Sequence, residues 1–172
     1  MTIRSSPPIL IFMEQSYAIL LKQAIKEVLE EIGFTNLTYT PVSPISFKDK
    51  KNEVVVLVGI VGGWKGHILL IMPETMGASF TTYLNAHLQM ETPSGVDPVS
   101  YQRHAIAEVA NQIAGRLAGL ESINGIEVLI TPPTLIAGNG IDPVLPHISE
   151  EWGYQIQGEF GYFYCILGIK NP

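Results

Sequence analysis

The chain has 172 residues, of which 47% are hydrophobic and only 15% are charged, and its formal net charge at pH 7 is −6. These values exclude a disordered chain. The length predicts a single domain over residues 1–172, with residues 1–12 as an extended N-terminal segment. Acidic residues outnumber basic ones, 16 to 10, and no basic face stands out, so nucleic acid is not expected as a partner.

Cys165 is the only cysteine and lies in an apolar run. This excludes a disulfide scaffold and predicts a core residue in a reducing compartment. No apolar run approaches the roughly 18 residues that a membrane-spanning helix needs. The run Ile9–Phe12 is too short for a signal core, and Glu14 follows it closely. We therefore expect a cytoplasmic protein without membrane insertion.

Strands are predicted wherever apolar runs are bounded by glycine or proline. The two longest runs flank Gly62-Gly63, which predicts a β-hairpin. Pro41 and Pro44 cannot donate ladder hydrogen bonds, so the strand beside them is expected at a sheet edge. The expected strands are residues 37–40, 53–61, 64–72, 126–130, 154–157 and 162–169.

Three helices are predicted from apolar residues that recur at three- and four-residue steps. They cover residues 13–32, a segment from Pro73 to about His87 or Met90, and residues 98–120. Asp97 is expected to cap the last of these, with Pro98 in its first turn. Three helices and about six strands without a dividing linker predict an α+β two-layer sandwich, with the helices packed on a mainly antiparallel six-stranded sheet.

Two familiar ligand motifs do not fit the sequence. Gly59, Gly62, Gly63 and Gly66 lack the spacing of a phosphate-binding loop, and a strand rather than a helix is expected after them. His104 and Glu108 are four residues apart on one helix and could supply two metal ligands, but a complete metal site needs more. We therefore expect a hairpin turn at the glycines and no metal site.

The helix over residues 98–120 carries the candidate site. At about 100° per residue, its expected core face consists of Ile106, Val109, Ile113, Leu117 and Leu120. On the opposite side, His104, Glu108, Asn111 and Gly115 form a polar stripe that spans only about 60° of arc. On spacing alone, the solvated face of an amphipathic helix explains this stripe as well as a functional site does.

Two residues of the stripe are unusual for an exposed helix face. Asn111 is a poor residue in mid-helix, because its side chain competes for backbone hydrogen bonds. Gly115 costs about 1 kcal/mol relative to alanine inside a helix. Close approach of another surface would explain Gly115, since the glycine removes a side chain from its path.

With these residues the sequence resembles the CheX/CheC family of chemotaxis phosphatases, and the CheX type in particular. The resemblance rests on Glu108-Val109-Ala110-Asn111, on Gly115, and on Pro133 just after the strand predicted over residues 126–130. The first helix lacks a second Glu-x-x-Asn, which favours the single-site CheX type. The family pattern places Asp or Ser four positions before the glutamate, where this chain has His104.

The resemblance implies that the protein removes the phosphoryl group from the aspartyl phosphate of a CheY-like response regulator. It implies that Asn111 positions the attacking water and that Glu108 pairs with the active-site lysine of the regulator. His104, Gly115 and Pro133 would support the site. The resemblance implies no cofactor of this chain's own, because Mg²⁺ would be supplied by the regulator.

Two other functions remain open at this stage. His104 could mark a non-catalytic module that binds or scaffolds phosphorylated regulators. The apolar composition alone would also allow a small-molecule sensor, which a deep apolar pocket would support. CheX-like proteins are typically dimers, and apolar hairpins need edge protection, so we expect a homodimer that joins sheet edges.

Overall fold

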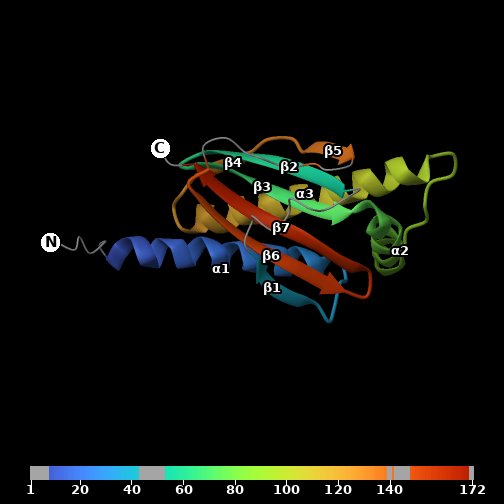
Figure 1. The fold of residues 1–172 in the computed structure, drawn as a ribbon, viewed down its shortest axis with the longest axis horizontal. Helices are drawn as coiled ribbons and strands as arrows, with labels where there is room; N and C mark the ends of the chain where they lie inside the picture. The colour runs from blue at the N-terminus through green and yellow to red at the C-terminus, as the bar shows by residue number, and fades with distance from the viewer. Residues whose placement is uncertain (1–7, 43–52, 139–140, 142–147, 171–172) are drawn as a thin grey trace.

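The computed structural model describes residues 8–42, 53–138, 141 and 148–170, and within them the chain forms three α-helices and seven strands (Figure 1). The helices are α1 (Pro8–Glu31), α2 (Gly77–Leu88), which follows one 3-10 turn η2 (Glu74–Met76), and α3 (Pro98–Ile123). The strands are β1 (Thr38–Val42), β2 (Glu53–Gly62), β3 (Lys65–Pro73), β4 (Val128–Ile130), β5 (Thr134–Gly138), β6 (Glu150–Gly158) and β7 (Gly161–Lys170).

The seven strands form one sheet in the order β1-β6-β7-β3-β2-β4, and the pairings among them are antiparallel. The helices α1 and α3 run along the same side of this sheet, and α2 lies at one end (Figure 1). This confirms the predicted α+β fold. The structure has one strand more than expected, because β5 pairs with the first half of β2 while β4 pairs with its last residues.

The main hydrophobic core fills the space between the helices and the sheet. Alternate residues of β2 are at most 2% exposed and belong to this core, as expected for one face of a pleated strand: Val54, Val56, Val58 and Ile60. The predicted core face of α3 is confirmed, with Ile106, Val109, Ile113 and Leu117 at most 3% exposed and Leu120 packed partly buried against them. Each such side chain contributes about 1.5–3 kcal/mol through burial.

The first helix begins earlier than the periodicity indicated. It starts at Pro8 rather than Met13, so residues 8–12 are helical and not extended. Proline suits a first helical turn, because the amide hydrogen that it lacks would have no partner there. Residues 1–7 lie outside the described part of the chain.

Capping and turn predictions agree with the structure. The Asp97 side chain accepts a hydrogen bond from the Ser100 amide (2.7 Å) at the start of α3. Gly62 has a φ of +120° in the turn between β2 and β3, so this turn is the predicted hairpin. Strand β1 is an edge strand that contains Pro41. Among the described strands, β1 lies at one edge of the sheet and β4 and β5 lie at the other. The predicted homodimer through sheet edges stays a prediction.

Cys165 is fully buried in the core, and burial raises the pKa of its thiol to about 12. This confirms the packing role expected from the sequence. Within the described residues, no helix is both long and apolar enough to cross a bilayer. The lysine-rich stretch 48–51 lies outside the described residues.

His67 is buried on the sheet face opposite to the main core, with 4% of its surface exposed. It faces Gly168 of β7, where a Cβ would stand 2.7 Å from His67 Nε2, so glycine makes room for the ring. Burial, and secondarily the charge of Lys170, lower the pKa of His67 from 6.5 to about 4. The folded protein therefore holds this imidazole neutral at pH values where an unfolded chain would bind a proton.

We expect the free energy of unfolding to fall as the pH drops from about 6.5 to 4, by up to about 3 kcal/mol, because the unfolded state takes up the proton first. His67→Met removes this proton uptake. The free energy of unfolding of the variant should therefore depend less on pH between 6.5 and 4, even if its stability at pH 7.5 differs from that of the wild type. Urea unfolding between pH 4 and pH 7.5 measures both curves. The same slope in the variant and the wild type would contradict the role of His67.

Candidate functional site

The polar stripe of α3 faces solvent in the folded structure. His104, Glu108 and Gly115 are exposed, and Asn111 is half-buried. Asn111 therefore stands at the border between the exposed and the buried sides of the helix. The helix backbone fixes the point from which its side chain projects, and the residue remains accessible from outside.

Small residues surround Asn111 on the helix surface. Positions three and four residues away are neighbours on an α-helix, and for Asn111 these are Ala107, Glu108, Ala114 and Gly115. Three of these four neighbours carry at most a methyl group. The helix therefore leaves the amide open on most sides and places one carboxylate beside it.

Hydrogen bonds hold the two other polar side chains of the stripe. Glu108 Oε1 accepts a hydrogen bond from Gln112 Nε2 (3.1 Å), one turn further along the same face. His104 Nδ1 donates to the carbonyl oxygen of Ser100 (2.7 Å), so the imidazole is hydrogen-bonded to the backbone of its own helix. Gln112 was not among the predicted site residues, although its i,i+4 spacing from Glu108 is the kind that permits such a pair.

The chain returns beside α3 through β4 and then β5, as Figure 1 shows. At this side of the helix, a Cβ on Gly115 would lie 3.9 Å from Ile130 Cδ1 of β4. Thr131 is tied to β2, because it exchanges hydrogen bonds of 2.9 Å with the amide and carbonyl of Gly59. Pro133 follows on this return path and is exposed. It lies three residues after Ile130, the β4 residue next to Gly115.

Polar contacts with α1 and α2 fix how α3 is rotated. Arg116 forms ion pairs with Glu27 (3.0 Å) and Glu31 of α1. Hydrogen bonds from Gln23 and from Arg116 lower the pKa of Glu27. On the other flank, the Tyr101 hydroxyl donates to Asn85 Oδ1 of α2 (2.8 Å). These contacts, together with the buried face, set the direction in which Asn111 and Glu108 project.

The described residues contain no group of three or more His, Cys, Asp or Glu side chains placed to hold a metal ion. Among the described residues, no further His, Cys, Asp or Glu side chain joins His104 and Glu108 to form a metal-binding group. The polar groups on this face are the amides of Asn111 and Gln112, the carboxylate of Glu108 and the imidazole of His104. An amide both donates and accepts hydrogen bonds, and a carboxylate binds a cation.

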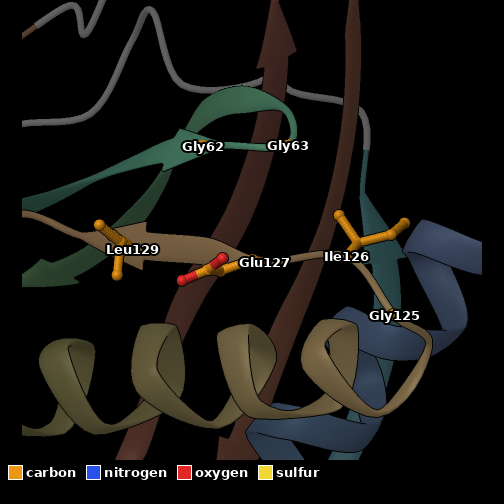
Figure 2. A pocket seen from close by; sticks show the side chains of 6 residues that line it. All are labelled: Gly62, Gly63, Gly125, Ile126, Glu127 and Leu129. Carbon is orange, nitrogen blue, oxygen red and sulfur yellow. The ribbon is translucent and has the colours of Figure 1, made fainter.

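The glycine-rich hairpin lies elsewhere and forms part of a surface pocket of about 700 Å³ (Figure 2). This pocket is lined by Gly62, Gly63, Gly125, Ile126, Glu127 and Leu129. The Gly63 amide donates to the Glu127 carbonyl (2.8 Å) and is not free to bind a phosphate. The pocket lies beside the C-terminal part of α3, where the chain turns back at Gly125 into β4 (Figure 2), and Asn111 is not among the residues that line it.

Comparison with known families finds one match over the site. The family model described as "Chemotaxis phosphatase CheX" matches residues 54–155, more than half of the chain. This range contains Glu108, Asn111 and Pro133. No curated protein matches the chain.

Several solved structures share the fold. A CheC-like superfamily protein from Shewanella sp. PV-4 superposes with a TM-score of 0.69 at 19% identity, covering 88% of this chain and 95% of the other. CheX in the CheX–CheY–BeF3–Mg²⁺ complex from Borrelia burgdorferi gives a TM-score of 0.66 at 21% identity, covering 90% and 98%. CheX from Desulfovibrio desulfuricans gives 0.63 at 21% identity, covering 89% and 98%. At these identities the likeness establishes the fold.

Internal packing does not require a glycine at position 115, because the added Cβ would make only ordinary van der Waals contact with Ile130. We expect Gly115→Ala to raise the free energy of unfolding by up to about 1 kcal/mol through helix propensity. Gly119→Ala is the matched control, since a Cβ there meets nothing within 4 Å. Thermal unfolding measures both. A lower melting temperature for Gly115→Ala alone would show that the fold itself needs this glycine.

Proposed function

Because the chain belongs to the CheX chemotaxis phosphatase family, we propose that it stimulates hydrolysis of the aspartyl phosphate on a CheY-type response regulator. The observation that carries the proposal is the accessible amide of Asn111 on α3, beside the exposed carboxylate of Glu108 and within the range that the family model matches. A protein complex rather than a bound small substrate is the natural target, because both groups project from an exposed helix face.

The proposed role of Asn111 is to hold the attacking water in line with phosphorus. Phosphoryl transfer passes through a loose transition state, so positioning and charge neutralisation matter more than covalent chemistry by the protein. A neutral amide can donate to one oxygen and accept from another at the same time. A carboxylate at this position would be repelled by the phosphoryl oxygens. The amide is therefore suited to guide a water molecule without opposing the negative charge around it.

The proposed role of Glu108 is to anchor the regulator through its active-site lysine. Glu108 and Asn111 are separated by about 4.5 Å along the helix axis, at 1.5 Å per residue. Gln112 holds Glu108 Oε1 (3.1 Å), which reduces the side-chain freedom that would be lost on binding. A lysine held by Glu108 would bring the neighbouring aspartyl phosphate close to Asn111. In this role the Glu108 carboxylate aligns the two proteins and does not act as a general base.

The regulator supplies the Mg²⁺ in this proposal, and the Borrelia CheX–CheY complex contains Mg²⁺. Asn111 and Glu108 then need no metal ligand from this chain. Gly115 and Ala107 have small side chains that do not protrude around the Asn111 amide. The helix can therefore approach an acyl phosphate that lies in the cleft of another protein. Pro133 is exposed in the loop between β4 and β5 and is proposed to shape the edge of this surface.

A non-catalytic regulator-binding module is the second candidate, and His104 is the observation that favours it. The family pattern has Asp or Ser at this position, whereas His104 bonds to the Ser100 carbonyl and is a larger side chain. Both candidates use the same docking surface. They differ in whether the phosphoryl group is lost faster in the complex than in the free regulator.

Asn111→Ala is expected to leave the fold and regulator binding intact and to reduce the stimulated hydrolysis by about 100-fold, the usual effect of losing one transition-state hydrogen-bonding group. Single-turnover loss of phosphate from a purified phosphorylated receiver domain measures the rate. Asn124→Ala, which removes an exposed amide just past α3, is the matched control and should behave as wild type. Wild-type turnover by Asn111→Ala would remove this residue from the mechanism. Binding by the wild-type chain without faster hydrolysis would favour the non-catalytic module.

Glu108→Gln keeps an acceptor for Gln112 but removes the charge that would pair with lysine. We expect about tenfold weaker binding of the activated regulator, in the range seen for close charge pairs at interfaces. The salt dependence of the affinity should also become shallower. Titration at two ionic strengths tests both effects. Glu127→Gln is the control, because Glu127 is an exposed carboxylate on the segment that follows α3 and is not part of the polar stripe. Equal affinities for the two variants would contradict the anchor role.

A further inference from the structure

A small apolar pocket opens directly beside the proposed site, between α3, α2 and the end of α1. Its volume is about 220 Å³. The apolar side chains that line it are Ile32, Leu84, Leu88, Met90, Ala105 and Val109. We call it the α2–α3 pocket. It is separate from the pocket of Figure 2, with which it shares no lining residue.

Glu108 belongs to the wall of the α2–α3 pocket as well as to the polar stripe. On the helix surface, Ala105 and Gln112 lie on one side of Glu108, and Asn111 and Gly115 lie on the other, as the 100° step between residues requires. The pocket and the catalytic amide therefore flank the same carboxylate. A protein that engages Glu108 and places its phosphate at Asn111 also extends over the pocket, unless it is very small.

The rim of the pocket exposes apolar side chains that the free protein leaves in water. Leu88 is 42% exposed and Met90 is 53% exposed. Both stand where α2 ends, and Gln89 between them adopts a left-handed conformation with a φ of +53°. Non-glycine residues rarely adopt that conformation, and it turns the chain so that Met90 folds back along the pocket. Association with an apolar group would remove this surface from water.

The walls of the pocket are held before any partner arrives. The Tyr101 hydroxyl bonds to Asn85 Oδ1 (2.8 Å), and this pair joins α3 to α2 across the pocket lining. The Met90 amide donates to the Asn85 carbonyl (3.0 Å), which secures the end of α2. A site preformed in this way binds its occupant without first losing side-chain freedom.

The size of the pocket indicates a side chain rather than a metabolite. Sites for small molecules usually measure about 300–1,000 Å³, and this pocket is smaller. It is large enough for one leucine- or phenylalanine-sized group. Shared walls with Glu108 and a preformed apolar interior together point to an anchor residue of the same protein that Glu108 binds.

We infer that the α2–α3 pocket receives an apolar side chain of the response regulator, from a surface next to its active-site lysine. This inference rests on the proposed function and adds a second point of attachment to it. Glu108 supplies charge recognition, and the pocket supplies apolar contact on the side away from Asn111. Regulators with a charged side chain at the corresponding surface would be rejected, because that charge would be buried without a partner.

The test uses two variants that alter the pocket in opposite ways. Leu88→Gln makes its rim polar, and Ala105→Met fills its interior. Leu129→Gln is the matched control, since Leu129 is 61% exposed on β4, away from the pocket. The probes are CheY-type receiver domains, activated with beryllofluoride for binding and phosphorylated with acetyl phosphate for hydrolysis. Thermal unfolding verifies that each variant is folded.

Both pocket variants are expected to weaken receiver binding at least tenfold and to raise KM much more than they lower kcat, because the pocket does not touch the reacting phosphate. Leu129→Gln should match the wild type. If the wild type binds and dephosphorylates a receiver domain and both pocket variants do so equally well, the pocket inference is overturned while the proposed function stands. If the wild type neither binds nor accelerates any receiver domain, both are overturned.

Discussion

The rotation of α3 about its own axis is the constraint on which the rest of this structure depends. One side of the helix is fixed by burial of apolar side chains between α1 and the sheet, including Ile113 and Leu117, which are fully buried. Arg116 adds ion pairs to Glu27 and Glu31 on the flank. With that rotation set, Glu108 and Asn111 must face outward. A turn of the helix by a few tens of degrees would bury the amide or move the carboxylate off the exposed face.

The elements that the sequence predicted well are those whose signal is local. The α3 segment combines a capping aspartate, a proline in the first turn and a regular apolar face, and all three appear in the structure as expected. The glycine pair between two apolar runs produced the predicted hairpin. The start of α1 and the separate strand β5 were missed for a different reason. Residues 8–12 are apolar on every position and show no helical period, and β5 is defined by pairing with β2, far away in the chain.

The candidate site was partly predictable for the same reason. Glu108, Asn111 and Gly115 follow from spacing along one helix, and the CheX/CheC resemblance that these residues carried is confirmed by the family match. Gln112 was missed, because an exposed glutamine is common and only its bond to Glu108 distinguishes it. The α2–α3 pocket could not be predicted at all. Its walls come from three helices, and their contact is decided by packing over long distances in sequence.

Stability alone does not explain the residues on the outer face of α3. An alanine would serve the helix better than Gly115, and the added Cβ would find room. Gly119 is equally open, however, so an exposed glycine does not by itself mark a site. What distinguishes the stretch from Glu108 to Gly115 is that a half-buried amide, an oriented carboxylate and small neighbours coincide on one accessible surface beside an apolar pocket. Asn111 and Gly115 lower the stability of the helix, and the rim of the pocket leaves apolar surface in water. Docking of another protein on this surface would account for both.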